Sequence, residues 1–166
     1  MKISVLLLIC TVVLYFVTKL VSNQYGSGTA ERFLERNVDY TAESLKTWVK
    51  DHRREADAYA FPVLFPLDLL FMSFLAATLS VASIWLGESI TWLRESVWVL
   101  LLLPALYLAV DLSEDALLAR FLTSPATITV EMVKIVQALT TIKIYSVFSA
   151  MAQAILLMAG ALIWRR

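Results

Sequence analysis

The feature that most constrains this chain is the long apolar segment from Ala60 to Gly87, which carries a single charged residue, Asp68. Its length matches the roughly 20 residues that an α-helix needs to cross the hydrocarbon core of a bilayer. Across the whole chain 60% of residues are hydrophobic and 17% are charged, whereas soluble domains have about half and about a quarter. The segment therefore predicts a membrane-spanning helix, and the chain belongs with integral membrane proteins.

Three further apolar runs predict three more transmembrane helices. The first run follows Lys2 and has no clear small-x-small cleavage site after it, so we expect a retained helix rather than a cleaved signal peptide. Ser124 and Pro125 separate the last two runs, because proline ends one helix and favours the start of the next. The predicted fold is all-α, with one domain forming a four-helix transmembrane bundle. The predicted spans are residues 3–21, 61–86, 97–118 and 143–164.

A charged segment, residues 29–59, separates the first two spans, and we expect it to be a helical insert outside the membrane. Thr41 is placed to cap its clearer second half. Apolar residues there recur at three- and four-residue spacing and share one helix face. That face either packs on the protein's own bundle or docks a partner. The candidate docking residues are Leu45, Trp48, Val49 and His52.

Ionisable residues of the second, third and fourth spans converge in this topology. Four crossings place both termini on one side of the membrane and the insert on the other. Asp111, Glu114 and Asp115 are spaced i,i+3 and i,i+4 and so share one helix face. We expect this face to meet the start of the second and fourth spans near the insert. The predicted polar cluster consists of Asp68, Asp111, Glu114, Asp115, Thr140 and Lys143.

The polar cluster has a structural and a functional interpretation. Charged groups cost about 2.5–3.5 kcal/mol each at the bilayer centre, so they face one another or water. One interpretation is an ion-paired network that fixes helix register, with Lys143 or Arg120 neutralising Asp68 and Glu114. The other is a binding site for an ion, a proton or a lipid head group. A divalent cation held by the carboxylates and His52 is a further alternative, although the sequence alone leads us to assign no metal ligand and no cofactor.

The sequence lacks the motifs that mark several classes of enzymes and binding proteins. No GxSxG, phosphate-loop or HExxH motif occurs, and the chain has one histidine, so we assign no catalytic residue. Cys10 is the only cysteine, which excludes an internal disulfide and a CxxC redox pair. Basic and acidic residues number 14 each, so no positive excess favours nucleic acid as a partner.

Three segments follow one another in an order that resembles a group of small bacterial four-helix membrane proteins. They are VDYTAESLKTWVKDHRREADAYAFPVLFPLDLLFM, LYLAVDLSEDALLARFLTSP and QALTTIKIYSVF. That group combines an Asp-containing second crossing, a D-x-x-E-N stretch in the third and T-x-x-K entering the fourth. The matching positions are Asp68, Asp111, Glu114, Thr140 and Lys143, and Asp115 stands where the pattern has Asn. The resemblance covers about residues 39–150 and implies the architecture, the cluster and a bacterial inner (plasma) membrane, but no activity.

From these features we expect a non-enzymatic integral membrane protein that serves as an accessory or scaffold component. Its partners would be the lipid bilayer and either another membrane protein or further copies of the same chain, not nucleic acid. The alternative is a small transporter or membrane enzyme that acts on an ion, lipid or apolar substrate at the polar cluster.

Overall fold

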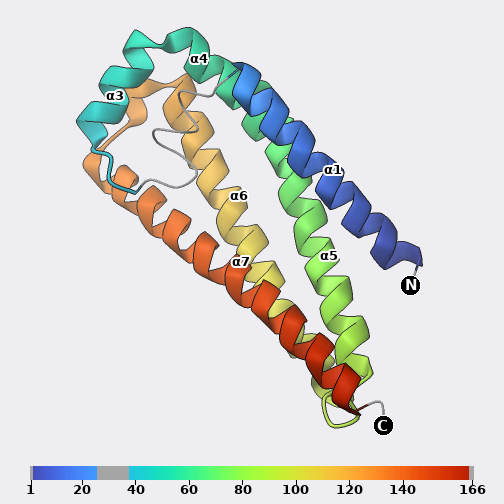
Figure 1. The fold of residues 1–166 in the computed structure, drawn as a ribbon. Helices are drawn as coiled ribbons and strands as arrows, with labels where there is room; N and C mark the ends of the chain where they lie inside the picture. The colour runs from blue at the N-terminus through green and yellow to red at the C-terminus, as the bar shows by residue number, and fades with distance from the viewer. Residues whose placement is uncertain (1, 26–37, 165–166) are drawn as a thin grey trace.

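The predicted all-α fold is confirmed in a computed structural model of the protein, which describes residues 2–25 and 38–164 (Figure 1). Helical segments account for every regular element in these two ranges. Four apolar stretches are long enough to cross a membrane, namely Ser4–Gln24, Arg53–Glu88, Arg94–Thr123 and Val130–Ile163. The principal helices in these stretches are α1 (Lys2–Tyr25), α5 (Leu69–Glu88), α6 (Leu102–Thr123) and α7 (Val130–Trp164).

The bundle is built from α5, α6 and α7, and α1 lies along α5 (Figure 1). Two shorter helices, α3 (Ala42–Asp51) and α4 (Arg53–Ala58), gather at one end of the molecule beside the 3₁₀ turn η4 (Pro125–Thr127). The first turn of α1 and the last turn of α7 lie away from that end (Figure 1). This arrangement agrees with the predicted topology, in which the insert and the loop at residue 125 lie opposite the two termini.

Helix α1 continues beyond its predicted end. The first span was predicted to end at residue 21, but the helix runs on to Tyr25. The Ser22 side chain is buried, and Val21 packs against the hydrophobic core, so this turn is held by packing despite its polar composition. The first part of the predicted insert, up to residue 37, lies outside the described residues.

The second span begins with a broken helix, where a regular one was expected from residue 61. The irregular helical segment η2 (Tyr59–Asp68) joins α4 to α5. Phe61 and Phe65 adopt extended backbone angles, with φ of −139° and −126°. Each precedes a proline, whose ring disfavours the helical conformation of the residue before it. Regular α-helix therefore starts only at Leu69, and Asp68 lies at the junction.

The third span begins with a 3₁₀ segment, and the fourth span begins with helical turns that precede the predicted start. A 3₁₀ segment, η3 (Arg94–Leu101), precedes α6. Helix α7 has 35 residues and is about 52 Å long at 1.5 Å per residue, well beyond the roughly 30 Å of a bilayer's hydrocarbon core. Its exposed surface becomes largely apolar from Ile142 onward. The helix is therefore longer than one crossing needs, and the apolar surface from Ile142 onward covers most of the predicted span of 143–164.

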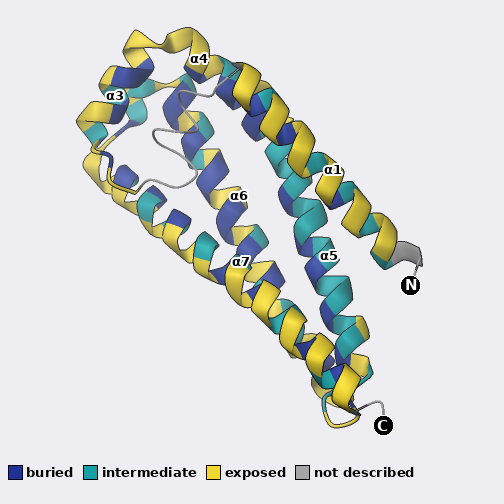
Figure 2. Ribbon diagram, viewed as in Figure 1, coloured by how far each residue is buried: buried dark blue, intermediate teal, exposed yellow. Residues whose placement is uncertain are grey.

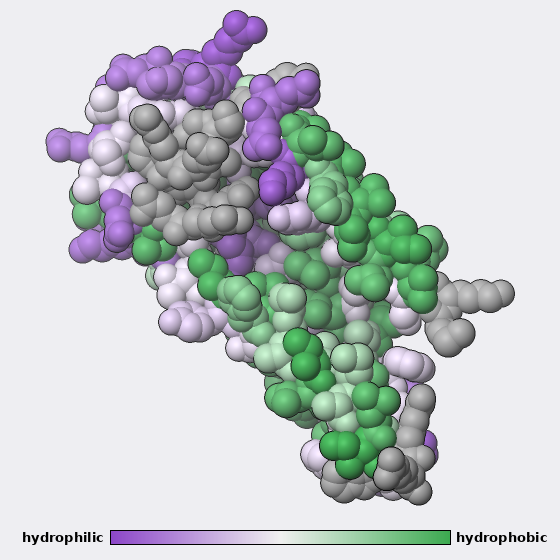
Figure 3. Space-filling view, in the orientation of Figure 1, coloured by the Kyte–Doolittle hydropathy of each residue, from purple (hydrophilic) through white to green (hydrophobic). Residues whose placement is uncertain are grey.

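The distribution of exposed residues fits a membrane-embedded bundle. Exposed faces of α1 and α7 carry large apolar side chains, whereas hydrophilic atoms concentrate around α3 and α4 (Figures 2 and 3). Trp85, Trp92 and Trp98 are exposed toward the opposite end of the bundle, as in the aromatic belts that mark membrane interfaces. The protein is therefore an integral membrane protein with four segments long and apolar enough to cross a membrane, and α3 and α4 form a hydrophilic cap at one end.

Candidate functional site

The structure brings the residues of the predicted polar cluster together from three elements. Asp68 ends η2, three acids lie in the middle of α6, and α7 supplies Thr140 and Lys143. The α6 acids are almost completely buried, since Asp111, Glu114 and Asp115 expose 3%, 0% and 2% of their surface. Charged side chains are rarely buried to this extent unless they are paired or bind a cation.

One half of the polar cluster is an ion-paired triad. Nζ of Lys143 lies 2.5 Å from Oε2 of Glu114 and 3.2 Å from Oδ1 of Asp111. The hydroxyl of Thr140 donates to Oε1 of Glu114 at 2.5 Å. Both oxygens of Glu114 thus have partners, and Lys143 neutralises Glu114 as the structural interpretation predicted. Arg120, the other predicted cation, is exposed and forms no ion pair within the described ranges.

The other half of the polar cluster is a group of three aspartates. Asp68, Asp111 and Asp115 each place one carboxylate oxygen within 4.8 Å of the oxygens of the other two. Oδ2 of Asp115 is buried and has no hydrogen-bond partner in the described part of the chain. The arrangement can therefore hold a cation or share a proton. The sequence predicted that these residues lie in one polar cluster, but it did not separate the three aspartates from the Glu114–Lys143 pair.

The segment before α3 covers the polar cluster on the insert side. Tyr40 is buried, and burial together with the nearby Glu114 carboxylate raises the pKa of its phenol to about 12. The amide Nε2 of Gln137 donates to the carbonyl oxygens of Val38 and Tyr40, at 2.6 and 2.8 Å. Gln137 on α7 therefore fixes this segment in place over the cluster.

Sequence reasoning missed Tyr40, Gln137 and Tyr107. Tyr107 lies one helical turn before Asp111, is buried, and its phenol interacts with the Asp111 carboxylate. Its i,i+4 spacing from Asp111 was a usable signal. Tyr40 and Gln137 gave none, because they are 97 residues apart and only the folded chain brings them together.

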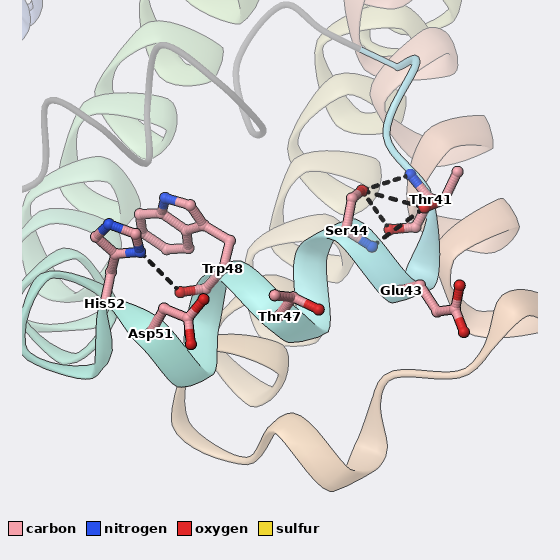
Figure 4. A pocket seen from close by; sticks show the side chains of 7 residues that line it. All are labelled: Thr41, Glu43, Ser44, Thr47, Trp48, Asp51 and His52. Atoms are coloured by element: carbon pink, nitrogen blue, oxygen red, sulfur yellow. Dashed lines mark hydrogen bonds between the residues drawn. The ribbon is translucent and has the colours of Figure 1, made fainter.

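The predicted docking face on α3 needs a correction. Leu45, Trp48 and Val49 are buried in the core formed with residues of α6 and α7, so the protein itself covers this face. His52 is exposed, stacks on Trp48 with ring centroids 5.2 Å apart, and its Nδ1 lies 3.2 Å from the Trp48 carbonyl oxygen (Figure 4). His52 is not part of the aspartate group, so the alternative of a metal site shared by the carboxylates and His52 does not form among the described residues.

A polar hollow runs along the outer side of α3 (Figure 4). Its lining residues are Thr41, Glu43, Ser44, Thr47, Trp48, Asp51 and His52. The predicted N-cap is confirmed here, because the Thr41 hydroxyl accepts from the Ser44 amide at 3.1 Å and the Ser44 hydroxyl accepts from the Thr41 amide at 3.0 Å. The polar groups at this end of the hollow thus serve to start the helix.

No protein-family model matches this chain, and neither the curated proteins nor the solved structures include a match to it.

Proposed function

We propose that this protein exchanges a proton for a metal cation at the polar cluster and acts as a small transporter in the bacterial inner membrane. The observation that carries the proposal is the burial of three carboxyl groups, Asp111, Glu114 and Asp115, around one ammonium group, Lys143. The bacterial membrane follows from the resemblance of the sequence motifs.

Charge balance favours a binding role over a purely structural network. A structural ion-pair network is stable only when each buried charge has a partner, because an uncompensated buried charge costs several kcal/mol. Lys143 already contacts two carboxylates, and Oδ2 of Asp115 has no hydrogen-bond partner in the described ranges. A proton or a bound cation would remove this cost, and exchanging one for the other is the elementary step of a coupled transporter.

A polar stripe on α7 supports transport rather than static binding. Thr140, Lys143, Ser146 and Gln153 follow one another at spacings that keep them on one helix face. Ser146 is buried, and Nε2 of Gln153 donates to the Ser83 hydroxyl at 3.0 Å. Polar groups inside a membrane bundle commonly mark ion or proton pathways, and this stripe leads from the polar cluster toward the terminal side.

The test is cation-dependent proton release from the purified protein in detergent micelles. We expect addition of the transported cation to release protons into weakly buffered solution and to reduce the infrared band of protonated carboxyl groups. Asp115→Asn should abolish both signals, and Asp57→Asn, which alters an exposed aspartate paired with Arg53, should leave them unchanged. Absence of both signals for Na⁺, K⁺, Mg²⁺, Ca²⁺ and Mn²⁺, with Asp115→Asn behaving like Asp57→Asn, would refute the proposal.

A second candidate, an accessory component, is favoured by the polar hollow on α3. The hollow carries the exposed acids Glu43 and Asp51. In this role a basic segment of another membrane protein would bind there. Charge reversal by Glu43→Lys and Asp51→Lys should then release a co-purifying protein seen by native mass spectrometry, and an unchanged mass spectrum would count against the role.

A further inference from the structure

We propose that Asp68, Asp111 and Asp115 bind a divalent cation of the hard class that includes Mg²⁺, Ca²⁺ and Mn²⁺. The inference rests on the proposed function, cation binding at the polar cluster, and specifies the ligands and the class of ion. It divides the cluster into an aspartate group that binds the ion and a Glu114–Thr140–Lys143 group that supports it.

The spacing of the three aspartate oxygens suits such an ion. They lie within 4.8 Å of one another, and three points this close always have a common point within about 2.8 Å of each. Calcium–oxygen bonds are about 2.3–2.6 Å long and magnesium–oxygen bonds about 2.0–2.1 Å. Small rotations of the carboxylates would therefore complete coordination, with water filling the other positions.

The carboxylate of Asp115 is a second observation, independent of the oxygen spacing, that points to a bound cation. It is 2% exposed, it points toward Asp68 and Asp111, and its Oδ2 has no hydrogen-bond partner among the residues that the structure describes. An ionised carboxylate in such surroundings is strongly unfavourable by itself. Asp115 therefore occupies the position of a metal ligand, where a divalent cation would offset two of the negative charges.

The neighbouring residues are arranged as an outer shell. Glu114 has both oxygens occupied by Thr140 and Lys143 and so is not available as a ligand. Lys143 also holds Oδ1 of Asp111 at 3.2 Å, which orients that carboxylate toward the other aspartates. Partners of this kind typically tune metal affinity by about 10–100-fold.

The donor set and its position determine which ion fits. All three donors are carboxylate oxygens, and no histidine or cysteine belongs to the group, a combination that suits Mg²⁺, Ca²⁺ or Mn²⁺ rather than softer metals. Asp68 is only partly buried and lies at the junction of η2 and α5, toward the α3 and α4 end. An ion from the aqueous phase would enter past this residue.

The direct test is Mn²⁺ binding to the purified full-length protein in micelles, measured by electron paramagnetic resonance of the free ion. We expect one Mn²⁺ per chain, displaced by Ca²⁺ or Mg²⁺ but not by Na⁺. Loss of an outer-shell partner alone lowers metal affinity by about 10–100-fold. Because Asp68 and Asp115 are proposed as direct ligands, Asp68→Asn and Asp115→Asn should each weaken Mn²⁺ binding by more than about tenfold. The matched control, Asp57→Asn, should bind Mn²⁺ like the wild type.

Thermal unfolding separates loss of the ion from loss of the fold. A ligand that binds only the folded state raises the melting temperature, so Mn²⁺ should stabilise the wild type and Asp57→Asn but not Asp115→Asn. Without metal, Asp115→Asn should melt no lower than the wild type, because it removes a buried charge. A folded Asp115→Asn protein that has lost Mn²⁺ binding would thus establish the ligand role.

Failure of this inference is distinguishable from failure of the proposed function. It is wrong if the folded wild type binds no Mn²⁺, or if Asp115→Asn and Asp57→Asn bind it equally. Should Na⁺ or K⁺ then still cause proton release that depends on Asp115, the cluster binds a monovalent cation and the proposed function holds. Should no cation do so, both proposals are wrong.

Discussion

At the scale of single residues, the charge balance of the polar cluster depends on Lys143. Both ion pairs that the structure shows within the cluster involve its Nζ, at 2.5 Å from Glu114 and 3.2 Å from Asp111. A buried ion pair contributes little net stability compared with apolar packing. Removing one partner, however, leaves the other charge buried and unpaired, which costs the full desolvation free energy. Lys143 therefore stabilises the folded cluster by pairing with two buried carboxylates, whether or not the aspartates bind an ion.

Lys143→Met should destabilise the protein strongly. We expect a loss of about 3–5 kcal/mol in the free energy of unfolding, the cost typical of breaking a buried pair. Equilibrium denaturation in detergent micelles measures this loss. The double variant Lys143→Met/Glu114→Gln also removes the charge of Glu114, which the single variant leaves unpaired. It should therefore recover part of the lost free energy of unfolding.

Asp57→Asn is the matched control for Lys143→Met, because Asp57 forms an exposed ion pair with Arg53 at 3.1 Å. Exposed pairs are worth about 0–1 kcal/mol. If Lys143→Met costs no more than this control, or if the double variant is less stable than the single one, the ion-paired triad does not contribute as described.

Tyr40 gives a pH-dependent prediction outside the membrane-spanning segments. Its pKa is raised from 10.0 to about 12, chiefly by burial and also by Glu114. Below pH 10 the phenol is protonated in both the folded and unfolded states. Between about pH 10 and 12 only the unfolded state loses the proton, so the free energy of unfolding should fall by about 2–3 kcal/mol as the pH rises through this range.

Phenolate absorbance checks the Tyr40 prediction directly. The difference between the titration curves of the wild type and Tyr40→Phe should show one tyrosine that ionises near pH 12, and the variant should lose stability less steeply in alkali. A difference curve centred near pH 10 would mean that Tyr40 is accessible to water and does not cover the polar cluster.

At the scale of elements, α3 is a part of the core rather than a free amphipathic helix. Its buried residues Leu45, Trp48 and Val49 contact the same core as Phe121 of α6 and Val136 of α7. Arg53, just after α3, donates to the carbonyl oxygens of Leu122 and Thr123 at 3.1 and 2.6 Å. These contacts connect the cap to the exposed ends of the membrane helices.

Leu45→Ala should therefore destabilise the whole protein. A completely buried leucine truncated to alanine typically costs about 2–5 kcal/mol, whereas Lys50→Ala on the exposed side of the same helix should cost less than about 0.5 kcal/mol. Thermal unfolding of the two variants makes the comparison. Equal melting temperatures would show that α3 does not pack on the bundle and would restore its apolar face as a docking surface.

Local sequence patterns predicted most of these elements. The three- and four-residue spacing identified the face of α3, and the i,i+4 spacing of the acids with the antiparallel topology was enough to place them beside Lys143. The sequence could not show what covers the α3 face, because Phe121 and Val136 are remote in the chain. Nor could it separate a paired Glu114 from Asp115, since this depends on side-chain directions in three packed elements.

At the scale of the whole molecule, the two ends of the bundle differ in their chemistry. The hydrophilic end contains α3, α4 and the turn at Pro125–Thr127, and the polar cluster lies beneath it. The opposite end has the exposed Trp92 and Trp98 around the connection between α5 and α6. An ion at the cluster would therefore exchange with the aqueous phase on the side of the cap.

Cysteine labelling tests this sidedness. Cys10 is the only native cysteine, so Cys10→Ala gives a background in which Lys50→Cys, Ala126→Cys and Glu95→Cys can be made singly at exposed positions. In sealed vesicles of one orientation, a membrane-impermeant maleimide should label positions 50 and 126 together and leave position 95 unlabelled. Vesicles of the opposite orientation should reverse the pattern, and permeabilised vesicles should label all three. Labelling of positions 50 and 95 from the same side would mean that the second span does not cross the bilayer. The carboxylates of the polar cluster would then lie in water, where they could not take part in transport of an ion across the membrane.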